Sequence, residues 1–210
     1  RVDHFRAFYN YWEIPAGEKT AINGKWVEGP GAHFFSAVLQ ELGQLPIIAE
    51  DLGVITPEVE ALRDQFGFPG MKVLQFAFGH DDKLFRGLME GFPENSVIYT
   101  GTHDNDTTLG WFHNTSGRNP EEAELERANV KRLLHSDGSN LNWELIEIAL
   151  KSSARAAIIP LQDVLGLGTE GRMNLPGTTQ GNWEWRFTED MLTEEIKQRM
   201  KQLTIYSGRG

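Results

Sequence analysis

Short apolar runs alternate along this chain with segments in which apolar residues recur every three or four positions. The short runs predict strands at residues 1–5, 46–49, 72–78, 97–100 and 156–161. The periodic segments predict helices at residues 34–42, 57–66, 143–150 and 196–203. Strands that alternate with helices favour a parallel sheet with right-handed crossovers, so we expect an α/β fold.

Two stretches fall outside this alternation. Residues 8–31 are rich in glycine and aromatic residues and predict a long loop. Residues 107–140 are polar and carry a run of glutamates, and they predict a helical insertion. We expect the charges of this insertion to face solvent.

The number of strands limits the architecture. Five strands are too few to close a barrel of eight, and a complete (β/α)8 barrel usually takes about 250 residues, whereas this chain has 210. The chain also begins with Arg1 inside a predicted strand. We therefore expect the carboxyl-terminal half of a TIM (β/α)8 barrel, incomplete as given. Residues 1–210 would form one partial catalytic domain that holds strands four to eight.

Charge and composition narrow the class of ligand. The net charge of −10 at pH 7 argues against nucleic acid or an anionic membrane as partner, because both need clustered Lys and Arg. A neutral ligand such as a sugar agrees better with this charge. The chain has no cysteine for disulfide bonds or thiol chemistry, and no apolar run approaches the length that spans a membrane. These features suit a cytoplasmic protein.

Acidic residues follow three of the predicted strands. They occur in RVDH at residues 1–4, IIAED at residues 47–51 and IYTGTHDND at residues 98–106. In parallel α/β barrels the loops at the carboxyl ends of the strands surround one pocket. We therefore expect acids that are distant in sequence to meet in one site.

Two of these acids fit the chemistry of glycosidic bond cleavage. Arg1 and Asp3 project to the same side of a strand, and the guanidinium favours an ionised Asp3 that could act as a nucleophile. Glu50 follows three apolar residues, where partial desolvation would keep it protonated as a general acid. Cleavage with retention uses these two roles with the carboxyls about 5 Å apart, and a wider separation would mean inversion.

Each candidate acid also has a structural explanation. An Arg and an Asp two positions apart are often a structural ion pair, and Asp51 beside Glu50 could cap a turn. The HDND segment at residues 103–106 could bind a cation through its carboxylates and imidazole. No second histidine-rich group supports this alternative, so a metal site is not predicted.

Aromatic and amide residues supply further candidates for sugar binding. Trp26 lies in the glycine-rich loop, where its ring could stack on the apolar face of a glucose unit or pack against the protein. Phe76 at the end of a predicted strand and Asn174 in RMNLPG are weaker candidates. Trp183 and Trp185 could equally be core residues.

The quoted motifs, in their order and spacing, resemble those of a known family. RVDHF, AEDLG and GTHDNDT are similar to the catalytic regions of the 4-alpha-glucanotransferases, also called amylomaltases or disproportionating enzymes, which belong to the alpha-amylase clan. The segments GKWVEGPG, VLQFAFG and GRMNLPGTTQGNWEWR also resemble that family, so the resemblance covers nearly the whole chain.

The resemblance implies a role for each acid. Asp3 would be the nucleophile that forms a glycosyl-enzyme intermediate, Glu50 the general acid/base, and Asp104 the third acid, which holds sugar hydroxyls. Arg1 and His103 would orient Asp3 and bind the sugar at the cleavage point.

The resemblance also implies an α-1,4-glucan donor, a malto-oligosaccharide acceptor, retained configuration and no cofactor. The compartment would be the cytoplasm, or a plastid if the source is a plant or alga. Two alternatives stay open. One is a retaining α-glucan hydrolase, in which water intercepts the intermediate, and the other is a glucan-binding fragment that is inactive because the barrel is incomplete.

Overall fold

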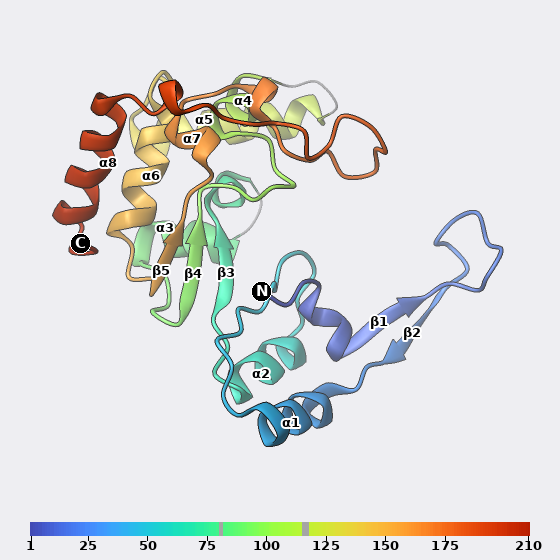
Figure 1. The fold of residues 1–210 in the computed structure, drawn as a ribbon. Helices are drawn as coiled ribbons and strands as arrows, with labels where there is room; N and C mark the ends of the chain where they lie inside the picture. Colours follow the sequence, from blue (N-terminus) through green and yellow to red (C-terminus); the bar gives the residue numbers. More distant parts are fainter. Residues whose placement is uncertain (80–81, 115–117) are drawn as a thin grey trace. The chain divides into compact units, whose positions relative to one another are not determined.

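The computed structural model describes residues 1–79, 82–114 and 118–210, and it forms two compact units (Figure 1). Unit 1 consists of residues 1–71 and 95–97, and unit 2 of residues 72–94 and 98–210. The chain contains helices and a parallel sheet, together with an antiparallel strand pair, so the predicted α/β class is confirmed. Strands β3 (Gly70–Val73) and β4 (Ser96–Tyr99) each contribute residues to both units.

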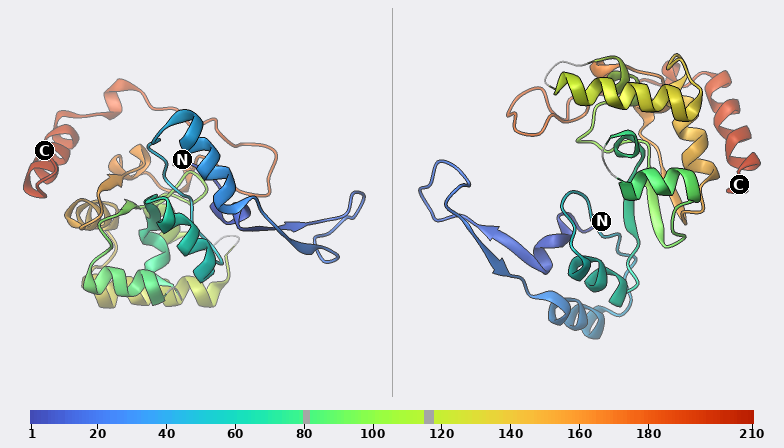
Figure 2. Two further views of the ribbon diagram at one scale, coloured as in Figure 1. Left: turned by 90° about the horizontal axis from the view of Figure 1, so that it is seen from below. Right: turned by 180° about the vertical axis from the view of Figure 1, so that it is seen from behind.

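Unit 1 contains a hairpin and two helices. Its elements are β1 (Asn10–Glu13), β2 (Lys25–Glu28), α1 (Gly31–Leu42) and α2 (Pro57–Gln65). The antiparallel pair β1–β2 places Trp12 opposite Trp26, and Figure 2 shows the hairpin as a two-stranded ribbon. Residues 8–31 therefore contain paired strands and are not the plain loop that the sequence predicted. The predicted first helix is confirmed, and Gly43 ends it with a φ of 69°.

An aromatic cluster forms the core of unit 1. Phe5 is fully buried, and its ring lies 5.4 Å from that of Phe35 and 6.2 Å from that of Phe68. His4 turns the chain inward through a left-handed conformation with φ of 49°, and a 3-10 helix over Phe5–Phe8 follows. The predicted strand at residues 1–5 is therefore wrong in extent, because burial of Phe5 ends it after Val2.

Parallel bridges order the short segments of unit 1. Val2 pairs with Ala49, and Ala49 pairs with Gly70 at the start of β3 (Gly70–Val73). The strand predicted at residues 46–49 is thus reduced to one bridging residue. Pro46 has no N–H to donate, which limits pairing before that residue.

Unit 2 combines the sheet with helices. The sheet has the strand order β3-β4-β5, with β4 at Ser96–Tyr99 and β5 at Ala156–Ile158. The helices are α3 (Asp82–Glu90), α4 (Thr108–His113), α5 (Pro120–Leu134), α6 (Leu141–Lys151), α7 (Leu161–Val164) and α8 (Glu194–Tyr206). The strand predicted at residues 97–100 and the helices predicted at 143–150 and 196–203 are confirmed.

Two predicted strands are too long. Strand β3 ends at Val73, and a 3-10 helix covers Leu74–Phe78. The apolar run misled the prediction because a short buried run has the same pattern in a strand and in a helical turn. Strand β5 ends at Ile158, and α7 begins directly after Pro160, so residues 161–163 are helical.

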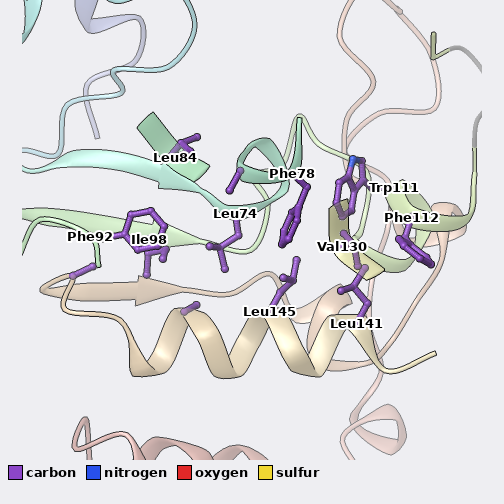
Figure 3. Close-up of a cluster of buried hydrophobic side chains, with 13 residues drawn as sticks. Leu74, Phe78, Leu84, Phe92, Ile98, Trp111, Phe112, Val130, Leu141 and Leu145 are labelled. Carbon is purple, nitrogen blue, oxygen red and sulfur yellow. The ribbon is translucent and has the colours of Figure 1, made fainter. Parts of the chain in front are cut away.

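The core of unit 2 lies between β4, the 3-10 helix and α6. Ile98, Leu74, Phe78 and Leu145 are fully buried and point into one cluster (Figure 3). Full burial of a side chain of this size stabilises the fold by about 1.5–3 kcal/mol. Helix α8 packs on the other side of α6, where Met200 contacts the cluster around Trp143 (Figure 1).

Helices α4 and α5 lie within the predicted insertion at residues 107–140, of which residues 115–117 fall outside the described part of the chain. The assignment of the chain to one partial barrel domain with an insertion stays a prediction. No helix in the described ranges is long and apolar enough to cross a membrane.

Candidate active site

Unit 1 holds Arg1 beside Asp3. The Nε atom of Arg1 donates to Oδ1 of Asp3 at 2.6 Å. The side chain of Asp3 is 68% exposed, whereas that of Arg1 is 25% exposed. The predicted pairing is therefore present, and most of the Asp3 side chain stays exposed within this unit.

The parallel bridge brings Glu50 to the same segment. The Glu50 N–H donates to the Val2 carbonyl at 3.0 Å, and the Phe5 N–H donates to the Glu50 carbonyl at 3.1 Å. These bonds flank Asp3 on both sides. The left-handed turn at His4 also points its N–H at Oε2 of Glu50. Backbone bonding therefore fixes the two candidate acids on adjoining segments, with Glu50 half-buried.

Asp51, the neighbour of Glu50, has a structural role. Its side chain is 3% exposed and forms an ion pair with Arg63. Its Oδ1 accepts the Met71 N–H at 2.7 Å. A Cβ at Gly70 would lie 2.3 Å from Oδ2 of Asp51, so this contact requires glycine. Of the two adjacent acids, only Glu50 is available for chemistry.

Trp26 lies on strand β2 of the hairpin. The Arg6 guanidinium stands 4.2 Å from the centre of its ring, and Trp12 meets it edge-on at 5.3 Å. Trp26 is nevertheless 53% exposed. One part of the ring is thus fixed by neighbours while the rest is open to solvent, as stacking on a sugar requires.

In unit 2, Asp104 follows β4 and is held by side chains. Its Oδ1 accepts from Nδ2 of Asn174 at 2.6 Å, and its Oδ2 lies 3.3 Å from Nε2 of His103. The Asn174 N–H also donates to the His103 carbonyl at 3.1 Å. The structure thus brings together three predicted site residues, one of them 70 positions away in sequence.

Two further residues lie around Asp104: Arg172 was not predicted as a site residue, and Trp183 was left open between a sugar-binding and a core position. Arg172 donates from Nη2 to the Asp104 carbonyl at 2.7 Å. The Trp183 ring lies 5.0 Å from that of His103 and is 53% exposed, so the core role considered for it is wrong. Its backbone has a φ of 65°. The only sequence signal was their position in the segment that also holds Asn174.

The neighbours of Asp104 serve the loop itself. Oδ1 of Asn105 accepts from the N–H and the hydroxyl of Thr102, at 2.9 and 2.8 Å. Oδ2 of Asp106 accepts from Oγ1 of Thr169 at 2.8 Å. Across the described ranges, no three His, Cys, Asp or Glu side chains gather as metal ligands would.

The sequence predicted Phe76 at the end of a strand, and this prediction is wrong. Phe76 lies within the 3-10 helix, between the buried residues Gln75 and Ala77, and is 40% exposed. The helical turn is what exposes its ring, because the residues on either side point into the core.

The parallel sheet, with exposed carboxylates in the segments after its strands, places the chain in the class of α/β proteins whose sites lie at the carboxyl ends of parallel strands. A family model described as 4-alpha-glucanotransferase matches residues 1–193, and the chain belongs to this family. A 4-alpha-glucanotransferase from Synechocystis is 51% identical over 100% of this chain and 40% of its own length. One from Thermus thermophilus is 47% identical over 97% of this chain and 41% of its own length.

A solved structure is similar as well. The amylomaltase from Streptococcus agalactiae, in complex with acarbose, is 34% identical and superposes with a TM-score of 0.87. The match covers 99% of this chain and 41% of that chain. The chain therefore spans about 40% of the length of the relatives it matches.

Proposed function

We propose that the protein transfers α-1,4-glucan segments between malto-oligosaccharides as a 4-alpha-glucanotransferase with retained configuration. The observation that carries this proposal is the family match over residues 1–193, which includes Asp3, Glu50 and Asp104. The geometry within each unit supports it, because each of these acids is oriented by neighbours and reachable from solvent.

Asp3 is the nucleophile of the first step. Arg1 at 2.6 Å favours its ionised form. One carboxylate oxygen of Asp3 attacks the anomeric carbon, the glycosidic C–O bond breaks, and Glu50 gives its proton to the leaving oxygen. The product of this step is a glycosyl ester on Asp3 together with a shortened glucan.

Glu50 acts as the base of the second step. It takes the proton of the 4-hydroxyl of an acceptor glucan, whose oxygen attacks the anomeric carbon and displaces Asp3. Two inversions give net retention. Oε2 of Glu50 is occupied by the His4 N–H, so Oε1 is the oxygen that exchanges the proton.

Asp104 stabilises the positive charge that develops on the sugar ring. The Asn174 amide and the His103 ring hold its carboxylate in place. A charge that is fixed in advance needs no reorganisation when the transition state forms. Exposed rings at Trp26 and Phe76 are suited to stack on glucose units.

We further propose that the parallel strands belong to a (β/α)8 barrel within one catalytic domain, with an insertion at about residues 107–140. The parallel bridges from Val2 to Gly70 and the order β3-β4-β5 support this architecture. The cytoplasmic location stays a prediction from composition.

Incubation with maltotriose tests the function. Chromatography should show glucose together with chains longer than three units, and Asp3→Asn should abolish both. Asp190→Asn is the matched control because it makes the same change at an exposed position and should keep activity. The same variants are assayed in a chimera in which residues 1–210 replace the matching segment of the Synechocystis relative.

The outcomes separate the alternatives. Longer chains that depend on Asp3 support transfer. Glucose and maltose without longer chains would mean a retaining hydrolase. Binding of acarbose without turnover, in the chain and the chimera alike, would mean a glucan-binding protein and would contradict the proposed function.

A further inference from the structure

A buried acid, Asp163, holds both ends of the loop that carries Asp104. Asp163 lies in α7 and is 1% exposed. Its Oδ2 accepts from Oγ1 of Thr100 at 2.5 Å, directly after β4. Its Oδ1 accepts from the N–H of Thr108 at 2.7 Å, at the first residue of α4. One carboxylate therefore brackets residues 101–107.

Asp163 is itself held in the core of unit 2. Its carbonyl accepts from Nδ2 of Asn142 at 2.8 Å, and Asn142 is 3% exposed. Asn142 belongs to α6, whose neighbouring residues Leu141 and Leu145 are fully buried (Figure 3). The bonds of Asp163 thus connect the loop to helix α6.

The position is unfavourable for a charge. Burial is the main cause that raises the pKa of Asp163 above its ordinary value, and the bonds from Thr100 and Thr108 only partly oppose it. Both oxygens of Asp163 nevertheless accept bonds from the two ends of one loop, and removal of the carboxylate would leave these buried donors without their acceptor. This arrangement indicates that Asp163 sets the geometry of that loop.

We propose that Asp163 is a positioning residue, which sets the place of the Asp104 carboxylate by fixing both ends of its loop. It acts through residues 101–107 and touches no sugar. The inference rests on the role proposed above for Asp104. Loss of both bonds would let the loop shift, and an error of about 1 Å at a reacting site can lower the rate roughly a hundredfold.

Two substitutions separate geometry from charge. Asp163→Ala removes both bonds and should lower kcat by up to about a hundredfold with a smaller change in KM. Asp163→Asn can keep both bonds, because its amide oxygen accepts from the Thr108 N–H and its amide N–H donates to the Thr100 hydroxyl. Asp163→Asn should therefore retain most of the activity.

Hydrogen exchange of the full chain gives a readout that does not depend on activity. Amides of residues 101–107 should exchange faster in Asp163→Ala than in the wild type and stay protected in Asp163→Asn. Phe92→Leu is the matched control. It weakens the same core from a position before β4, at the opposite end of that strand from the loop (Figure 3), and should leave loop exchange and kcat per folded molecule unchanged.

The outcomes are distinct. Fast loop exchange and low kcat in Asp163→Ala alone support the inference. Wild-type loop exchange in Asp163→Ala would overturn it, and so would an equal loss of kcat in Phe92→Leu or in Asp163→Asn. If the wild type does not extend maltotriose to longer chains, the proposed function is contradicted. The hydrogen exchange of residues 101–107 would still decide whether Asp163 fixes the loop.

Discussion

The two units orient their exposed acids by different means. In unit 1, backbone bonds between the Val2 and Glu50 segments fix the positions of Asp3 and Glu50. In unit 2, Asp104 is oriented by the side chain of Asn174, from a loop 70 positions further along the chain. Substitution of neighbouring side chains should therefore change the orientation of Asp104 in unit 2. In unit 1 such substitutions should have little effect on orientation, and activity should depend on Asp3 and Glu50 themselves.

The same contrast separates buried from exposed acids. The side chains of Asp3 and Asp104 are 68% and 50% exposed. Asp51 and Asp163 are nearly inaccessible to solvent. Their carboxylates accept hydrogen bonds from Arg63 and Met71, and from Thr100 and Thr108, respectively. Exposure thus distinguishes acids that a ligand can reach from acids that shape the fold.

The largest effect is expected from loss of Asp3, the proposed nucleophile. Asp3→Ala should lower kcat on the order of 10⁴-fold or more, as removal of a nucleophile does in other enzymes. Asp104→Ala should cost less, roughly 10²- to 10³-fold, because it removes electrostatic stabilisation only. Rates are measured from glucose release with maltotriose.

Azide sharpens this comparison. It should partly restore cleavage of an activated glucosyl donor by Asp3→Ala, because azide can attack the anomeric carbon from the vacated side and give a glucosyl azide. Azide should not increase the activity of Asp104→Ala, because this variant keeps Asp3. Glucosyl azide from Asp104→Ala, or its absence from Asp3→Ala, would contradict the assigned roles.

A smaller effect, on stability, is expected at the buried pair of unit 1. Asp51→Ala leaves the Met71 N–H without its acceptor and Arg63 without its buried partner, and loss of one member of a buried ion pair costs about 3–5 kcal/mol. Asp64→Ala is the control, because Asp64 bonds the same guanidinium but is 60% exposed, which predicts a change below about 1 kcal/mol. Urea unfolding measures both, and equal losses would contradict the distinction.

The next effect concerns the orientation of Asp104. Asn174→Ala removes a hydrogen bond to a charged group, worth about 1.5–3 kcal/mol, so kcat should fall roughly 10- to 100-fold. Asn182→Ala serves as control because Asn182 bonds within the same segment, to Leu175, without a described bond to Asp104. A similar fall in both variants would mean that the loop, and not the Asn174 amide, matters.

How far the sequence predicts the structure depends on the range of the contacts. Helix α1 and strand β4 follow local patterns, and both were predicted from them. The 3-10 helix at Leu74–Phe78 was not predicted, because the apolar run is the same for a buried strand. The hairpin was missed because its pairing, Trp12 opposite Trp26, joins residues across a long glycine-rich stretch.

The site shows the same limit. The pairing of Arg1 with Asp3 was predictable because the residues are two positions apart. The contacts of Arg172 and Trp183 around the Asp104 loop cross about 70–80 positions of chain and leave no local pattern. Asp163 lies just after the strand predicted at residues 156–161, and its burial leaves no local pattern because burial depends on tertiary packing.

The smallest effect is a pH dependence that contrasts Asp163 with an exposed acid. Burial raises the pKa of Asp163 above its ordinary value of 3.8, so the folded state binds its proton more tightly than the unfolded state does. The contribution of Asp163 to stability is therefore fully present below about pH 4 and is lost as the pH rises through the folded-state pKa. Asp163→Asn cannot titrate, so its stability relative to wild type should rise with pH.

Asp137 should behave in the opposite way. The hydrogen bond from Ser139 lowers the pKa of this exposed acid, so its contribution is present above the ordinary aspartate range and is lost as the pH falls. Urea unfolding of the wild type, Asp163→Asn and Asp137→Asn from pH 3 to 8 measures both differences. If the stability differences of the two variants from wild type change with pH in opposite directions, burial and not hydrogen bonding governs the pKa of Asp163. If they change in the same direction, the bonds from Thr100 and Thr108 outweigh the loss of hydration.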